Sequence, residues 1–136
     1  MAYLMTSLTT PLWRVQVGST SVGVVVFDSV GLNGMTTFQV TVKDVTPPIC
    51  TCPSDYYVSG DVGNYTTVLF NYPTAYDVVD GNLTLNVTCS RAKTNTSFFA
   101  GSYETILCEA KDSSGNAGVC LFSVFVDDGT GAKIVW

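Results

Sequence analysis

The segment Phe122-Ser-Val-Phe-Val-Asp-Asp128 repeats, with changes, the segment Phe38-Gln-Val-Thr-Val-Lys-Asp44, and the two lie 84 residues apart. Asp112-Ser-Ser-Gly115 and Asp28-Ser-Val-Gly31 are related by the same offset. A fixed offset between similar segments is typical of modules arranged in tandem. Tandem all-strand modules of this length usually serve as spacers or adhesive surfaces rather than enzymes. We therefore expect one complete module preceded by part of another.

Several further motifs occur together, in one order, in the second module. They are Asp44-Val-Thr-Pro-Pro-Ile-Cys-Thr-Cys-Pro53, Tyr72-Pro-Thr-Ala-Tyr-Asp77, Phe99-Ala-Gly101, Cys108-Glu-Ala-Lys-Asp-Ser-Ser-Gly-Asn116 and Cys120-Leu-Phe-Ser-Val-Phe-Val-Asp127. On these motifs residues 45–128 resemble a complete hyalin repeat (HYR domain), and residues 1–44 resemble the second half of one. The resemblance implies an all-β fold in which immunoglobulin-like β-sandwich modules follow one another in tandem. It also implies an extracellular protein with a role in adhesion. It implies no catalytic residues and no cofactor.

The composition favours a globular domain and excludes several other classes. Of the 136 residues 46% are apolar, which is enough for a core. The net charge of −5 and the scattered positions of the six basic residues argue against nucleic-acid binding, because a phosphate backbone requires clustered Lys and Arg. No apolar run reaches the roughly 18 residues of a membrane span. The start Met1-Ala-Tyr-Leu-Met-Thr6 lacks a basic segment followed by an apolar one, so we interpret residue 1 as the start of a fragment or of a mature chain.

The cysteines indicate an oxidising compartment. Five occur, all between Cys50 and Cys120. Strand alternation directs Cys89, Cys108 and Cys120 toward apolar neighbours on the core side. From this phase and the hyalin-repeat pattern we predict disulfides Cys89–Cys108 and Cys52–Cys120. Other pairings remain open, and Cys50 is an alternative to Cys52.

One cysteine is left over by this pairing. Structural zinc usually requires Cys-x-x-Cys spacing and four Cys or His ligands, whereas Cys50-Thr-Cys52 has the wrong spacing and the chain has no His. We therefore predict no metal at these cysteines. The remaining thiol forms either an intermolecular bridge or an unpaired buried thiol.

Four sequons support an extracellular location: Asn64-Tyr-Thr66, Asn82-Leu-Thr84, Asn86-Val-Thr88 and Asn95-Thr-Ser97. In an expected strand Asn82–Cys89, alternation puts Asn82 and Asn86 on the solvent face, opposite Leu83, Leu85 and Val87. We predict N-glycans, with Asn82 and Asn86 the favoured sites. The alternative is that these residues only furnish polar strand faces and turns.

Short strands separated by Gly, Pro, Asn and Ser predict a sandwich. A proline-containing segment, Lys43–Pro48, is expected to form an extended connection between the modules. The expected strands are Trp13–Val17, Ser21–Phe27, Thr36–Lys43, Tyr56–Val58, Thr66–Asn71, Asn82–Cys89, Tyr103–Ala110 and Val119–Asp127.

Acidic residues near strand ends raise the question of calcium, which requires oxygen ligands. The candidates are Asp77, Asp80, Asp112, Asp127 and Asp128. We favour turn roles for them and predict no metal site, because Asp80-Gly-Asn82 and Asp112-Ser-Ser-Gly-Asn116 are good turn sequences without the regular acidic spacing of a calcium loop. A sugar-binding surface of tyrosines is a further alternative, although tyrosine is also a common strand residue. These tyrosines are Tyr56, Tyr57, Tyr65, Tyr72, Tyr76 and Tyr103.

Catalysis finds little support in the sequence. Histidine, the commonest general base, does not occur, and there is no Gly-x-Ser-x-Gly elbow or phosphate-binding loop. The carboxylates of Asp77 and Asp80 lie in a turn-like segment without a supporting motif. We predict that the chain is not an enzyme.

The first module differs from the second in ways that favour contact with another chain. At the offset of 84, Val25 and Phe27 replace the outward-facing Glu109 and Lys111, which makes this strand apolar on both faces. A strand that is apolar on both faces requires cover on both faces.

The tail offers a candidate for that cover. After Asp128 the chain continues as Gly129-Thr-Gly-Ala-Lys-Ile-Val-Trp136, a glycine hinge followed by a short apolar strand. We predict an assembly interface of Val25, Phe27, Ile134, Val135 and Trp136, and a homo-oligomer or filament formed by strand exchange. The alternative is that both ends are cut edges of a longer array whose missing residues complete the fold in cis.

The sequence therefore predicts an extracellular module, secreted or on the cell surface, with a structural or adhesive role. It is expected to be glycosylated and disulfide-bonded, and to assemble head to tail into a fibril or array. The second interpretation is a ligand-binding module that holds calcium or glycan at its loops.

Overall fold

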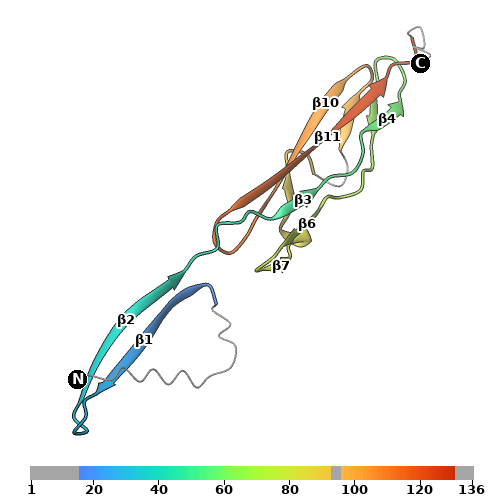
Figure 1. The fold of residues 1–136 in the computed structure, drawn as a ribbon. Coiled ribbons are helices and arrows are strands. Elements are labelled where there is room, and N and C mark those ends of the chain that lie inside the picture. The colour runs from blue at the N-terminus through green and yellow to red at the C-terminus, as the bar shows by residue number, and fades with distance from the viewer. Residues whose placement is uncertain (1–15, 93–95, 131–136) are drawn as a thin grey trace. The chain divides into compact units, whose positions relative to one another are not determined.

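The computed structural model describes residues 16–92 and 96–130 (Figure 1). The chain divides into two compact units, Met1–Asp44 and Val45–Trp136, and each is described by itself. Both consist of β-strands, and the described residues contain no α-helix. The predicted all-β fold is therefore confirmed, and the second unit is consistent with a β-sandwich.

The first unit is built on one antiparallel hairpin of β1 (Gly18–Phe27) and β2 (Asn33–Val42). The connecting turn forms because Asp28 Oδ1 accepts hydrogen bonds from the amides of Val30 and Leu32, both at 2.9 Å. Gly31 takes the positive φ of 86° that closes the turn. Gln16 and Val17 are not in a strand, and the rest of the expected strand Trp13–Val17 lies outside the described residues.

The described part of the second unit contains three sheets. The four-stranded sheet has the order β4-β11-β10-β8, with β10 and β11 as long adjacent strands (Figure 1). The others are β3-β6-β7 and β5-β9. The bounds are β3 Ile49–Thr51, β4 Tyr56–Ser59, β5 Tyr65–Thr67, β6 Thr74–Asp77, β7 Gly81–Asn82, the 3₁₀ turn η1 Thr84–Asn86, β8 Thr88–Cys89, β9 Ser97–Phe99, β10 Tyr103–Lys111 and β11 Ala117–Asp127.

The two long hairpins share one register. In β10–β11 Cys108 is opposite Cys120, and in β1–β2 Val24 is opposite Thr36, the positions 84 residues earlier. Every other cross-strand pair of β1–β2 that has a counterpart in β10–β11 is related to it by the same offset. The sequence repeat therefore corresponds to one repeated supersecondary unit.

The core of the second unit lies on one face of β10–β11. Side chains alternate along both strands, and every second residue is buried apart from Glu104 and Cys120, which are partly buried. Phe122 is at the centre, with its ring centroid 5.1 Å from that of Phe70 and 6.1 Å from that of Tyr56. The buried apolar residues are Val68, Phe70, Ala75, Leu83, Val87, Phe98, Ala100, Ile106, Cys108, Ala110, Phe122, Val124 and Val126.

The predicted strand Asn82–Cys89 is wrong. It is divided into β7, η1 and β8, and Leu85, expected to face the core with Leu83 and Val87, is 99% exposed. Polar side chains break the strand: Asn82 Oδ1 accepts from the amide of Thr84 at 2.9 Å, and the Thr84 hydroxyl bonds to the backbone of Ala75. Such bonds compete with a strand ladder.

Other boundaries also differ from the expectation. The strand expected at Thr66–Asn71 is the shorter β5, and the sequence did not indicate β3, β6 or β9. These three strands are only three or four residues long, too short to show a clear alternation.

Candidate functional site

Two disulfides cross-link the second unit. Cys89 and Cys108 are cross-strand neighbours on β8 and β10 with an S–S distance of 2.05 Å. Cys52 and Cys120 are bonded at 2.04 Å and link the segment after β3 to β11. The separations along the chain are 19 and 68 residues, so the second bridge closes most of the unit into a loop.

Cys50 is a free, half-buried thiol in the structure. Its Sγ donates a hydrogen bond to the carbonyl oxygen of Gly118 at 3.3 Å. Burial raises the pKa of this thiol, and the charge of Glu109 adds to the shift. A raised pKa lowers the thiolate fraction, which makes Cys50 a poor nucleophile.

The hairpin of the first unit exposes the face that is buried in the second. We call Val22, Val24, Val26, Phe38, Val40 and Val42 the core-equivalent face, because at the offset of 84 they correspond to buried β10–β11 positions. Phe38 is 51% exposed, whereas its counterpart Phe122 is 2% exposed. Among the described residues of this unit, no second layer covers the face.

The structure describes only some of the residues that were predicted to form an assembly interface. Val25 and Phe27 are exposed on the opposite face of β1, while Ile134, Val135 and Trp136 lie outside the described residues. The core-equivalent face was not named from the sequence. The sequence repeat could have identified this face, because the offset that showed Val25 and Phe27 to be unusual also relates Phe38 to Phe122.

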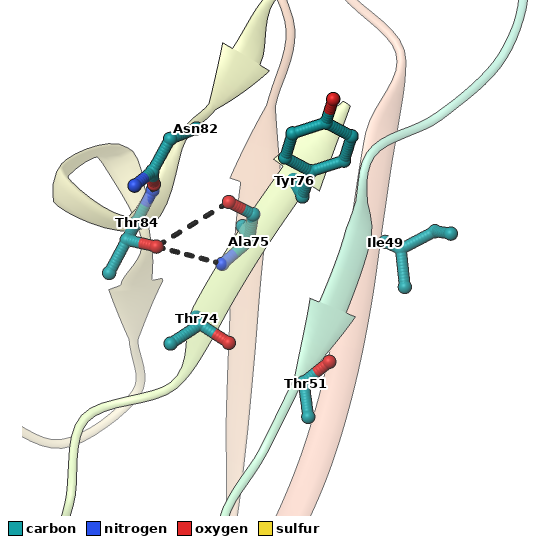
Figure 2. A pocket seen from close by; sticks show the side chains of 7 residues that line it. All are labelled: Ile49, Thr51, Thr74, Ala75, Tyr76, Asn82 and Thr84. Carbon is teal, nitrogen blue, oxygen red and sulfur yellow. Dashed lines mark hydrogen bonds between the residues drawn. The ribbon is translucent and has the colours of Figure 1, made fainter. Parts of the chain in front are cut away.

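Three predicted glycosylation sites are exposed: Asn64, Asn82 and Asn86. Asn95 lies outside the described residues. Asn82 is paired across β6–β7 with Tyr76, at the edge of a surface hollow (Figure 2). The hollow is lined by Ile49, Thr51, Thr74, Ala75, Tyr76, Asn82 and Thr84. Its polar groups are hydroxyls and an amide, which suit hydrogen bonding rather than acid–base chemistry.

The tyrosines divide between core and surface. Tyr56 packs against the core, and the Tyr72 hydroxyl donates to the carbonyl of Val87 at 3.1 Å. The exposed ones are Tyr57, Tyr65, Tyr76 and Tyr103. Tyr57 and Tyr65 each pack on a neighbouring phenylalanine ring, Phe125 and Phe99 respectively.

The five aspartates considered for calcium all accept hydrogen bonds from residues in turns. Asp127 Oδ1 and Asp128 Oδ1 accept from the amides of Gly129 and Thr130. Asp80 accepts from the amide and hydroxyl of Ser113, at 2.7 and 2.8 Å, and so links the β6–β7 turn to the β10–β11 turn.

Asp77 and Asp112 are the two that the fold brings together. Burial alone would raise the pKa of Asp112, but hydrogen bonds from the Asn116 side chain and from the amides of Asn116, Ser114 and Gly115 outweigh it. The pKa of Asp112 is therefore lowered, and its carboxyl is ionised at neutral pH.

Within residues 16–92 and 96–130 no helix is long and apolar enough to cross a membrane.

Comparisons with known proteins agree with the motifs. The family model for the HYR domain matches residues 43–126. A protein named Hyalin from Strongylocentrotus purpuratus is 32% identical over 113 residues, which are 81% of this chain and 9% of that protein. The chain thus spans less than a tenth of this relative. A solved structure titled "The structure of CBM51-2 in complex with GlcNAc and INT domains from Clostridium perfringens ZmpB" has 21% identity and a TM-score of 0.38, over 58% of this chain and 16% of that one.

Proposed function

Because the chain belongs to the HYR domain family, we propose that it is an extracellular adhesive and structural module that works by binding further copies of itself. The observation that carries this proposal is the exposed core-equivalent face of β1–β2, whose counterpart on β10–β11 forms the core of the second unit. The two disulfides support the extracellular location, because such bonds persist in oxidising compartments. Catalysis has no part in this function.

The surface of the hairpin suits an added strand. Within residues 16–44 the sheet has two strands, so each has an outer edge whose backbone groups are not paired with another described strand. Its core-equivalent face exposes Phe38, Val40 and Val26. An apolar face beside open edges binds another polypeptide by strand addition, with backbone hydrogen bonds for affinity and side-chain contacts for specificity.

The strand that covers this face comes from a second copy of the chain. Gly129 has a φ of 72° and begins the tail, whose last residues, Ala132–Trp136, supply the apolar strand. Contact between unlike surfaces of successive copies does not close on itself unless rotation makes a ring, so it produces a filament. Completion of the hairpin in cis is the competing arrangement.

A charge on the core-equivalent face abolishes assembly in this account. Phe38→Asp places a carboxylate in the contact, and burying it unpaired costs at least about 3 kcal/mol, or more than about a hundredfold in association constant. Sedimentation velocity over a concentration series measures the effect. The matched control is Gln39→Asp, which adds the same charge to the opposite face of the same strand.

The outcomes separate the two arrangements. In the proposal, wild type and Gln39→Asp form oligomers that grow with concentration, whereas Phe38→Asp and a chain without Gly129–Trp136 remain monomers. A truncated chain that still assembles rules out the tail as the donor. A wild-type chain that is monomeric throughout leaves completion in cis as the arrangement.

The module carries N-glycans at Asn82 and Asn86 in this proposal. Both asparagines are exposed, and their sequon threonines are Thr84 and Thr88. Enzymatic deglycosylation of material from a secreting eukaryotic host lowers the intact mass, and Asn82→Gln and Asn86→Gln each remove one glycan. A mass that deglycosylation leaves unchanged contradicts the expectation.

A further inference from the structure

The hollow on the β3-β6-β7 sheet places a sequon asparagine beside an exposed aromatic ring. Asn82 is directly opposite Tyr76 in β6–β7, and Tyr76 is directly opposite Ile49 in β3–β6. Residues opposite each other in an antiparallel pair point to the same face of the sheet. The three side chains therefore form one row, with Tyr76 between Asn82 and Ile49 (Figure 2). The whole row lies within the second unit.

This row offers an apolar surface bordered by hydroxyl groups. Tyr76 is 58% exposed and Ile49 is 71% exposed. Thr51 and Thr74, which are opposite each other two positions along the same strands, line the hollow beside them. A pyranose ring has a face of C–H bonds and a rim of hydroxyls, so its face can pack on the apolar side chains while its rim bonds to the threonines. The hollow measures about 480 Å³, within the roughly 300 to 1,000 Å³ of small-molecule sites.

The chain itself can carry the occupant of this surface. Asn82-Leu-Thr84 is a sequon, and Asn82 Oδ1 accepts a hydrogen bond from the amide of Thr84 at 2.9 Å. This bond orients the side chain through its oxygen and does not use Nδ2, the atom to which an N-glycan is attached. A tethered sugar reaches its neighbours at an effective concentration of about millimolar, so a contact too weak to hold free sugar becomes populated.

Tyr76 differs in one respect from the other tyrosines considered for sugar binding. In the strand pairs of residues 16–92 and 96–130, it is the one tyrosine that lies opposite a sequon asparagine. The sequon asparagine Asn86 ends the 3₁₀ turn η1 and is outside these strand pairs. We therefore expect a glycan on Asn82 to behave differently from one on Asn86.

We propose that the first N-acetylglucosamine of an Asn82 glycan packs its apolar face on Tyr76 and Ile49. The inference rests on the proposed glycosylation of Asn82 and gives that glycan a structural role. The strand β7 is two residues long, and only two residue pairs join it to β6: Tyr76 with Asn82 and Asp77 with Gly81. A sugar that connects Asn82 to Tyr76 adds a contact across this short pairing and stabilises it.

The test uses the full chain with Asn82 as its single sequon. Asn64→Gln, Asn86→Gln and Asn95→Gln remove the others, and intact mass of material from a secreting eukaryotic host reports the glycan. An endoglycosidase then trims it to one N-acetylglucosamine, and an amidase removes it completely. The one-sugar form should have a Tm about 3 to 8 °C above that of the sugar-free form, the effect of one aromatic contact in a domain of this size.

Two variants locate the contact. Tyr76→Thr should reduce this Tm difference to less than about 1 °C. The matched control Tyr57→Thr makes the same change on β4, outside the hollow, and should leave the difference as it is. The amidase converts the sequon asparagine to aspartate in every protein compared, so the effect of that conversion cancels. If Tyr76→Thr does not fold, proton NMR of the one-sugar wild-type form decides, because packing on the Tyr76 ring shifts the C–H protons of the sugar upfield.

The outcomes separate the glycan from its packing. An intact mass without sugar at Asn82 overturns the proposed glycosylation and this inference with it. A glycan that is present but gives equal Tm differences in the wild-type chain and in Tyr76→Thr, or sugar protons without an upfield shift, overturns the packing alone.

Discussion

Replacing Cys52 and Cys120 together by alanine lowers the free energy of unfolding of the second unit by about 4 kcal/mol. The bridge spans 68 residues, and a cross-link across a long segment removes much entropy from the unfolded chain. The double replacement of Cys89 and Cys108 costs less, about 3 kcal/mol, because that bridge spans 19 residues. Urea unfolding followed by circular dichroism measures both.

Peptide mapping under non-reducing conditions supplies the control. Cys50 should be the one cysteine that alkylates after denaturation of the wild-type chain. Alkylation of Cys89 or Cys108 would contradict the pairing, and an unfolding free energy unaffected by Cys52→Ala with Cys120→Ala would contradict its structural importance.

Phe122→Ala costs about 3 to 5 kcal/mol of unfolding free energy, because it empties the centre of the core. Phe122 is 2% exposed and packs on Phe70 and Tyr56. The matched control is Phe38→Ala at the same position of the repeat. Phe38 is 51% exposed, so its removal costs less than about 1 kcal/mol in dilute, monomeric protein.

The pair of variants also reports on assembly. Phe38→Ala should weaken the association of copies while leaving the urea midpoint of the second unit unchanged. A stability loss as large for Phe38→Ala as for Phe122→Ala would mean that the core-equivalent face is already covered within the monomer.

Much of the second unit follows from alternation in its long strands. Phe122, Val124 and Val126 are spaced by two, and all three are buried. Two long strands bounded by turn residues are enough to predict the hairpin, and the offset of 84 then predicts its copy at β1–β2. The all-β class needed no more than this.

In the segment around Leu85, side-chain alternation does not predict the structure. The pattern Leu83, Leu85 and Val87 is as regular as the one in β11, yet Leu85 is 99% exposed. The difference comes from Asn82 and Thr84, whose side chains bond to the backbone and open the strand into a 3₁₀ turn. Strand propensity does not include such side-chain bonds, and the partner of Thr84, Ala75, lies on another strand, β6.

The proximity of Asp77 and Asp112 could not be predicted from spacing either. The two residues are 35 positions apart along the chain, and they follow strands of different sheets, β6 and β10, which only the fold brings together. Each aspartate sits in a sequence that is itself a good turn. A cluster of this kind becomes visible only with the tertiary structure.

Amide hydrogen exchange tests the central claim most directly, because β10–β11 serves as the internal reference for β1–β2 in the same sample. The account predicts slow exchange in β10–β11 at every concentration, since its core face is covered. In β1–β2 it predicts fast exchange in dilute protein and exchange slowed by at least about tenfold once copies associate. Exchange in β1–β2 that does not change with concentration would contradict the claim that a second copy covers this hairpin.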